Sequence, residues 1–262
     1  MHNGPLTGFK VLHLGFRSIF ISGSSLRVFV FLWLISVTLS LAADTPAATP
    51  PPDAILDHYC SATRAQEGSL AGASMEVDMN GYLPKLQKHG KLHALRRISP
   101  LGLIKYEMLR FEGDRTVNKE VIQRYLNAEV DLQKEHHSDT ALTPDNYRFK
   151  YKSMNRSDGR DVYVFQVTPK QKRENLFRGE VWIDAQTYLK VQESGFLVKN
   201  PSILIKKVAF IRKYEIHDGI SVPKQVLSVV DTRLVGKAEL TIDFTRFEID
   251  PSRRASAEMA DQ

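Results

Sequence analysis

The chain has 262 residues, of which 42% are hydrophobic and 25% are charged, as in an ordinary globular protein and unlike a disordered one. Its 36 basic and 30 acidic residues give a formal charge of +6, and three of the basic residues, Lys10, Arg17 and Arg27, precede the first acidic residue. The 33 basic residues that remain barely exceed the 30 acidic ones, so the composition excludes a strongly basic domain that binds nucleic acid.

An export signal is predicted at the start of the chain. In residues 1–43 those three side chains are the only charges, and an uncharged, largely apolar run extends from Val28 to Ala43. The run has 16 residues, fewer than the roughly 18 to 20 that a membrane-spanning helix needs. We therefore predict that residues 1–43 are a cleavable secretory signal peptide. Retention of this segment as an N-terminal membrane anchor is the alternative.

Three segments are predicted after the leader. Residues 44–52 contain four prolines and should form a stiff linker. Residues 53–250 should form one folded domain, followed by a small, polar and disordered tail over residues 251–262. Because Cys60 is the only cysteine, no internal disulfide can stabilise the domain in an oxidising compartment.

The domain is expected to begin with a helix over residues 53–66, with Asp53 as its N-cap. Apolar residues recur there at helical spacing, and Cys60 belongs to the same stripe, which favours a buried structural thiol. The stripe comprises Ile55, Leu56, Tyr59 and Cys60.

From Ser69 onward the apolar residues alternate with a period of two, which predicts strands near residues 70–82, 88–98 and 103–111. Gly81, Gly90 and Gly113 are among the residues expected to mark strand ends. A second helix interrupts the strands, capped by Asp114 or Thr116. Its apolar stripe comprises Val117, Val121, Ile122, Tyr125, Leu126 and Leu132.

The second half of the chain consists of strands joined mostly by short turns. The last of them alternates cleanly, with Ala238, Leu240, Ile242 and Phe244 on one side, so its sheet is wet on one face only. About ten strands and two early helices, without regular alternation, predict a mainly β (α+β) fold built on a curved antiparallel sheet. The two helices are expected to cross its concave face. Strands are predicted near residues 147–152, 162–168, 179–184, 189–198, 203–216, 222–234 and 238–249.

The sequence contains neither a phosphate-binding glycine loop nor a nucleophile elbow. His89 and His93 have the spacing of a helical metal pair, but in a strand that spacing separates them by roughly 13 Å. His136 and His137 lie in a polar loop and are interpreted as solvated. The sequence therefore predicts a protein without metal or cofactor that is not an enzyme.

Two further features of the sequence, a basic cluster and a set of apolar stripes, bear on what the protein binds. A basic cluster could attract anionic head groups or an acidic partner, although a solvated face that protects an edge strand is the simpler interpretation. Its members are Lys85, Lys88, Lys91, Arg96 and Arg97. Apolar stripes point instead to an internal cavity between sheet and helices. Its predicted lining is Tyr147, Phe149, Tyr151, Leu240, Ile242 and Phe244.

One hairpin resembles that of the outer-membrane lipoprotein carrier superfamily, the LolA/LolB-like or lipoprotein-sorting proteins. The pattern is an apolar strand, Trp-Ile-Asp, a short turn with Thr, and a return strand with Leu-x-Val. Here these positions are Trp182, Ile183, Asp184, Thr187, Leu189 and Val191. Further similar segments are Val162–Pro169, Val117–Leu126 and Asp231–Ile242.

This resemblance implies a half-open β-barrel with helices across its concave face and an apolar cavity for acyl chains. It predicts a periplasmic carrier that sorts lipoproteins or transfers other lipids without catalysis. The implied partners are acyl chains of lipoproteins or other lipids, with membrane-anchored donor or acceptor proteins. The alternative is a periplasmic regulatory, sensor or scaffolding module that binds a membrane-anchored partner.

Overall fold

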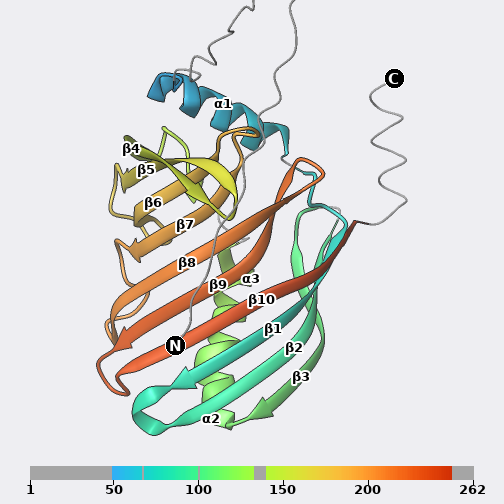
Figure 1. Cartoon of the computed structure of the whole chain (residues 1–262). Coiled ribbons are helices and arrows are strands. Elements are labelled where there is room, and N and C mark those ends of the chain that lie inside the picture. Colours follow the sequence, from blue (N-terminus) through green and yellow to red (C-terminus); the bar gives the residue numbers. More distant parts are fainter. Residues whose placement is uncertain (1–48, 67, 100, 133–139, 250–262) are drawn as a thin grey trace, which may run out of the picture. The chain divides into compact units, whose positions relative to one another are not determined.

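The computed structural model describes residues 49–66, 68–99, 101–132 and 140–249. In this part of the chain ten strands form a single antiparallel sheet in the order β3-β2-β1-β10-β9-β8-β7-β6-β5-β4 (Figure 1). The edge strands β3 and β4 do not pair with each other, so the sheet is curved but unclosed. The predicted mainly β half-barrel is therefore confirmed. The predicted signal peptide and tail, like His136 and His137, lie outside the described residues.

The strands match the predicted segments to within a few residues. The first three are β1 (Ala73–Leu83), β2 (Lys88–Ile98) and β3 (Ile104–Gly113). A short 3-10 helix, η1 (Pro84–Leu86), joins β1 to β2. The later strands are β4 (Tyr147–Ser157), β5 (Arg160–Pro169), β6 (Phe177–Asp184), β7 (Lys190–Leu197), β8 (Ile205–His217), β9 (Ile220–Thr232) and β10 (Lys237–Ile249).

The first predicted helix is confirmed as α1 (Pro52–Ala65), although its N-cap is Pro51 and not Asp53. The fixed φ of a proline suits the first helical position, which Pro52 occupies, so the helix begins one residue earlier than predicted. Asp53 lies in the first turn, where its charge favours the helix N-terminus.

The second predicted helix is confirmed as three consecutive segments, α2 (Arg115–Val117), the π-helix η2 (Asn118–Gln123) and α3 (Arg124–Leu132). Asp114 is the N-cap, because its carboxylate accepts hydrogen bonds from the amides of Thr116 at 2.8 Å and Val117 at 3.2 Å. In Figure 1 these segments lie behind the strands, across one face of the sheet. No described helix is long and apolar enough to cross a membrane.

Buried apolar side chains gather mainly on one face of the sheet, here called the inner face, in two large clusters and a small third one of Leu83, Val117 and Ala238. The β10 cluster consists of Ala73, Met75, Val77, Met79, Leu92, Ala94, Ile98, Ile122, Leu126, Val226, Leu240, Ile242 and Phe244. The β5 cluster consists of Ile55, Tyr59, Tyr147, Tyr163, Phe165, Val167, Leu176, Phe177, Val181, Ile183 and Phe210. The second helical segment contributes to the first cluster and α1 to the second.

The prediction that Gly81 and Gly90 mark strand ends is wrong. Both lie within strands, where they pair with each other across β1 and β2. A Cβ atom at Gly81 would come within 2.8 Å of Val117, and one at Gly90 within 2.3 Å of the Asn118 side chain. These glycines therefore let η2 approach the backbone of the sheet.

Candidate functional site

A single row of paired residues crosses the inner face from one edge of the sheet to the other. Eight of its ten members are apolar or aromatic, and the fourth and fifth members counted from β4, Glu193 and Arg212, are charged. From β4 to β3 the row is Tyr151, Phe165, Val181, Glu193, Arg212, Val226, Ile242, Met79, Leu92 and Phe111. The inner face is thus two apolar regions with a charged junction between them.

The six residues predicted to line a cavity all lie on this inner face, but on both sides of the junction. Leu240, Ile242 and Phe244 belong to the β10 cluster. Tyr147 belongs to the β5 cluster, and Phe149 and Tyr151 pack against it. Six strand steps separate β10 from β4, roughly 29 Å along the sheet. The six residues therefore form two separate apolar walls, and their contact with a ligand stays a prediction.

Helix α1 covers the β5 cluster. Ile55 and Tyr59 are both almost completely buried there. The Tyr59 ring lies 6.4 Å from that of Phe149, and the His58 ring lies 4.6 Å from that of Tyr188. The side-chain oxygen of Gln66 accepts a hydrogen bond of 2.9 Å from the amide of Ser221. These contacts fix the helix at both ends.

Segments η2 and α3 cover the β10 cluster through Ile122 and Leu126. Polar contacts hold the next turn of α3, where the Glu129 carboxylate accepts a hydrogen bond of 3.0 Å from Arg96 and another from the Tyr106 hydroxyl. Arg96 is buried on β2, and its Nε atom has no hydrogen-bond partner. At this turn of α3 a buried ion pair between Arg96 and Glu129 holds the helix in place of apolar contacts.

The junction between the clusters is an ionic group centred on Glu193, whose side chain is 4% exposed. Its Oε1 atom lies 3.3 Å from Lys190 Nζ and 3.5 Å from Arg212 Nη1, and it accepts a hydrogen bond from the Tyr214 hydroxyl. Burial alone would raise the pKa of this carboxyl, but the charges of Lys190 and Arg212 outweigh it and lower the pKa to about 2. Glu193 is therefore ionised at neutral pH.

A hollow of about 240 Å³ adjoins the β10 cluster where β8, β9 and β10 meet. Met75 and Phe244 belong to both, so the hollow opens onto the core itself. Small-molecule pockets usually measure about 300 to 1,000 Å³, so the hollow is smaller than a typical ligand pocket. Its lining consists of Met75, Glu215, His217, Pro223, Phe244, Thr245, Arg246 and Phe247.

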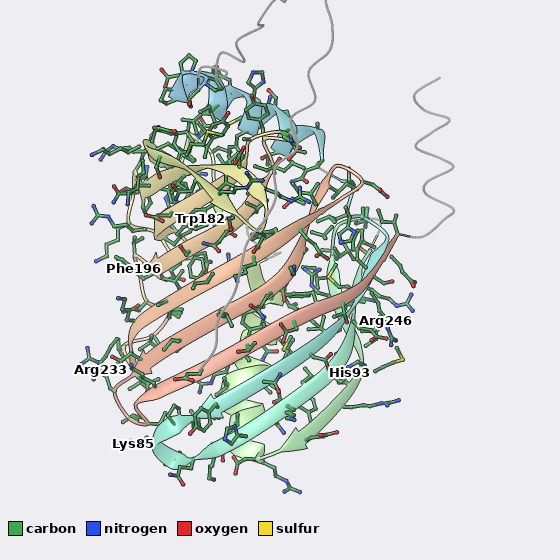
Figure 2. All side chains as sticks on the ribbon, viewed as in Figure 1. Lys85, His93, Trp182, Phe196, Arg233 and Arg246 are labelled. Carbon is green, nitrogen blue, oxygen red and sulfur yellow. The ribbon has the colours of Figure 1, made fainter. Side chains whose placement is uncertain are left out.

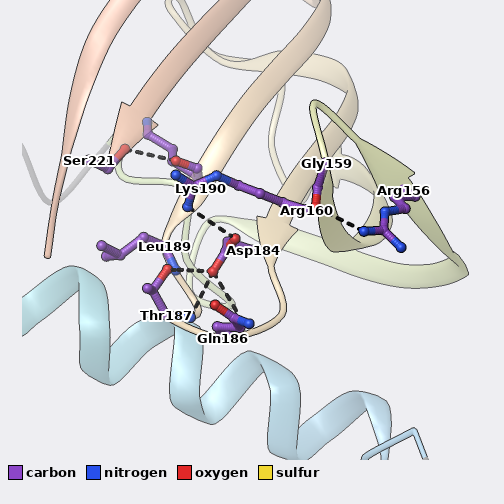
Figure 3. Close-up of polar contacts among 9 residues, drawn as sticks. All are labelled: Arg156, Gly159, Arg160, Asp184, Gln186, Thr187, Leu189, Lys190 and Ser221. Atoms are coloured by element: carbon purple, nitrogen blue, oxygen red, sulfur yellow. Dashed lines mark hydrogen bonds and ion pairs between the residues drawn. The ribbon is translucent and has the colours of Figure 1, made fainter. Parts of the chain in front are cut away.

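The hairpin motif noted in the sequence has a structural role (Figure 3). Asp184 is 1% exposed at the end of β6, and its Oδ1 atom accepts hydrogen bonds from the Gln186 amide, the Thr187 amide and the Thr187 hydroxyl at 3.1, 2.8 and 2.8 Å. Ile183 points into the β5 cluster, whereas Trp182 lies on the opposite face of the sheet from α3 (Figure 2). The motif therefore locks the β6–β7 turn.

The predicted basic cluster is divided by the structure. Arg96 lies buried on the inner face, while Lys88 pairs with Asp114 and Arg97 pairs with Glu107, each at 2.9 Å. Because alternate residues of β2 face opposite sides of the sheet, these positions cannot form one surface patch.

The two histidines of β2 have separate partners. His89 stacks on Tyr82 with a centroid distance of 4.1 Å, and His93 Nδ1 lies 2.9 Å from the Asp78 carboxylate. In the described part of the chain, no three His, Cys, Asp or Glu side chains group closely enough to hold a metal ion.

The ionic junction is the feature that sequence reasoning missed, although a signal for it exists. In β8 the inner-facing residues Val208, Phe210 and Tyr214 alternate regularly, and Arg212 occupies the position where that pattern demands another apolar residue. A charge at an inward position of an otherwise apolar strand indicates a buried partner. Its partner, Glu193, lies on another strand and is identified only by the register.

Residues 138–240 match a family model described as a family of unknown function, DUF5686. No curated protein matches the sequence. A similar solved structure is a DUF1329 family protein from Desulfovibrio piger, with 16% identity and a TM-score of 0.43 over 78% of this chain and 95% of that one.

Two further structures carry the names predicted from the hairpin. They are a putative outer membrane lipoprotein-sorting protein domain from Vibrio parahaemolyticus (12% identity, TM-score 0.36, 75% of this chain and 92% of that one) and a LolA superfamily protein from Nitrosomonas europaea (10%, 0.34, 78% and 97%). The predicted resemblance is therefore found again among solved structures. At these identities and TM-scores, none of them assigns a function to this chain.

Proposed function

We propose that this protein is a periplasmic lipid-binding carrier that buries acyl chains between its inner sheet face and the covering helices, without catalysis. Sorting of outer-membrane lipoproteins is the form of this function that the hairpin resemblance favours. The single observation that carries the proposal is the row across the inner face, which is apolar on both sides of its centre. The predicted export signal is consistent with it.

The energetics of an acyl chain make such a carrier necessary. Removing one CH₂ group from water is worth about 0.8 kcal/mol, so a chain of about 15 carbons represents on the order of 12 kcal/mol. No chain of that length crosses an aqueous compartment unaided. A carrier has to provide a comparable apolar area and release it again, which requires a cover that moves.

The structure offers a suitable cover in η2 and α3. Only Ile122 and Leu126 of these segments are buried in the β10 cluster, with Val121 and Tyr125 packed more loosely against it. The hollow beside Phe244 reaches the same cluster from the side. An acyl chain that enters there would displace the helical segment from the sheet and occupy its apolar contacts.

Native mass spectrometry and displacement of a hydrophobic dye by a triacylated lipopeptide test this function. We expect the unmodified protein to retain lipid and to release the dye. Phe247→Trp should weaken displacement at least tenfold, because Phe247 lines the hollow and packs against the β10 cluster, so that the larger indole takes up part of the hollow's volume. Thr241→Trp, on the same strand and away from the hollow, is the matched control and should bind normally.

Two outcomes would overturn the proposal. One is a protein that neither carries lipid nor exchanges dye for any acylated compound. The other is that both tryptophan variants and an Ile122→Asp variant bind lipid as tightly as the unmodified protein does. A ligand whose affinity is unaffected by changes in the hollow and in the helical cover does not bind the inner face.

The regulatory or scaffolding alternative is favoured by a different feature, the free edge of the sheet. Among the strands that the structure describes, none pairs with the outer side of β3, and Met108, Leu109 and Phe111 of this strand are exposed. Such an edge can accept an extended segment of a membrane-anchored protein as an eleventh strand. If this is the function, Leu109→Lys should abolish crosslinking to that partner and leave dye binding intact, and a variant that crosslinks normally contradicts it.

A further inference from the structure

The ionic junction has one more positive than negative charge. Lys190 and Arg212 both approach the same oxygen of Glu193, and the Tyr214 hydroxyl donates to it as well. One carboxylate cannot neutralise two cations. The two cations are also the accessible part, since the side chains of Lys190 and Arg212 are 27% and 38% exposed while Glu193 is 4% exposed.

The junction lies where the two apolar regions meet. Glu193 pairs with Val181 of the β5 cluster, and Arg212 pairs with Val226 of the β10 cluster. It also lies between the regions that the helices cover, because α1 packs on the β5 cluster and α3 packs on the β10 cluster. A chain that follows this row from one region to the other passes Lys190 and Arg212.

The cations are held in place by aromatic rings. Lys190 Nζ lies 4.5 Å from the centroid of the Tyr214 ring, and the Arg212 guanidinium lies 4.6 Å from that of Phe210. These contacts, together with Glu193, restrict both side chains before any ligand binds, which reduces the entropy that binding costs. The arrangement is that of a preformed binding site for one anionic oxygen group.

We propose that the guest is an anionic amphiphile whose negatively charged oxygen group binds Lys190 and Arg212 while its acyl part packs on the adjoining apolar regions. This inference rests on the proposed lipid-binding function and adds the chemical class of the lipid. A neutral amphiphile bound here would remove one cation of the junction from water without giving it an anionic partner. Burying an unpaired charge in this way is costly. The site therefore selects against uncharged lipids as well as for charged ones.

Matched pairs of amphiphiles separate charge from chain length. Dye displacement is measured with palmitate against hexadecanol, and with palmitoyl lysophosphatidylglycerol against monopalmitoylglycerol. We expect the anionic member to bind at least about tenfold more tightly, as for a charge-assisted hydrogen bond. Preference confined to the first pair identifies a carboxylate as the natural group, and preference confined to the second identifies a phosphate.

Variants of Arg212 test the residues. Arg212→Gln should remove most of the preference for the anionic member and leave the affinity for hexadecanol unchanged, whereas Arg212→Lys should keep the preference. Lys213→Gln, the next residue of β8 on the opposite face, is the control with the same loss of charge. Circular dichroism and urea unfolding establish that each variant is folded before it is titrated.

The outcomes distinguish this inference from the proposed function. Equal affinity for charged and neutral members in the unmodified protein, or an undiminished preference in Arg212→Gln, overturns the anionic class and leaves lipid binding standing. If no amphiphile of either kind displaces the dye, both proposals are wrong.

Discussion

Single side chains of the inner face differ sharply in what they contribute. Most are apolar and stabilise the fold by burial, whereas Glu193 is buried and charged, a state that is costly unless partners compensate for it. Lys190, Arg212 and Tyr214 supply that compensation on one oxygen atom. The buried carboxylate of Asp184 is compensated locally, by hydrogen bonds that it accepts from residues of its own turn.

The depressed pKa of Glu193 predicts a specific pH dependence of stability. Its pKa falls from an ordinary value of 4.5 to about 2 in the folded protein. The stabilisation is therefore complete above pH 4.5 and is lost as the pH falls toward 2, by on the order of 3 kcal/mol. We expect Glu193→Gln to be less stable than the unmodified protein at pH 7, with the difference shrinking between pH 5 and pH 2.

Urea unfolding at a series of pH values measures this difference. Glu112→Gln, which changes an exposed carboxylate of β3, is the control and should show no comparable convergence. A gap between Glu193→Gln and the unmodified protein that stays constant down to pH 2 would show that the ionisation of Glu193 does not contribute to the stability of the fold.

The arrangement of elements depends on how closely the second helical segment approaches the sheet. Gly81 of β1 and Gly90 of β2 pair across the strands directly beneath Val117 and Asn118. Without Cβ atoms they leave the space that η2 occupies, and the Asn118 amide then donates to the Glu112 carbonyl at 3.0 Å. The position of the helical cover thus depends on the lack of side chains at Gly81 and Gly90 as much as on its own apolar stripe.

Gly90→Ala should loosen this cover. The added methyl group would lie 2.3 Å from the Asn118 oxygen and 3.0 Å from Val117, so η2 has to move away from the sheet. We expect a loss of about 1 to 3 kcal/mol in the free energy of unfolding, as for overpacking of a core. Amides of η2 and α3 should exchange with deuterium faster than in the unmodified protein.

Lys91→Ala is the control, because Lys91 is the next residue of β2 and its side chain is exposed. Its effect should stay within about 0.5 kcal/mol. If Gly90→Ala is equally mild and leaves exchange in η2 unchanged, the close approach of helix and sheet is not what holds the cover.

The described domain as a whole is one continuous sheet with two large hydrophobic clusters, the β5 cluster and the β10 cluster, and a small third one. The two large clusters share no residue, and the charged pair Glu193 and Arg212 stands between them in the row that joins β6 to β9. Backbone pairing is continuous across this junction, whereas apolar packing is interrupted there. Local opening of one side should therefore leave the other side protected.

Two equivalent substitutions test this independence. Ile242 in the β10 cluster and Ile183 in the β5 cluster are both fully buried, and replacing each with Val removes one methyl group at a cost of about 0.5 to 1.5 kcal/mol. Hydrogen exchange should increase mainly in β1, β2 and β10 for Ile242→Val, and mainly in β4, β5 and β6 for Ile183→Val. The same exchange pattern for both variants would mean that the sheet opens as one unit.

The amino-acid sequence by itself determined the class of fold and the face of each strand. Alternation with period two in segments such as Ala238–Phe244 places side chains on one face whatever the neighbours are, and the cap at Asp114 marks a helix start through contacts within three residues. These are local properties of the chain. For the same reason the ten strands and two helical regions were predictable, together with the position of the six proposed lining residues on the inner face.

Only the tertiary structure decided which side chains share a site. The register of β7 against β8 sets Glu193 opposite Arg212, and the register of β1 against β2 sets Gly81 opposite Gly90. A shift of one residue in either pair would turn a strand over and exchange its two faces. Because such pairings depend on contacts between distant segments, the alternation of β8 marks Arg212 as an inward charge but does not reveal that Glu193 is its partner.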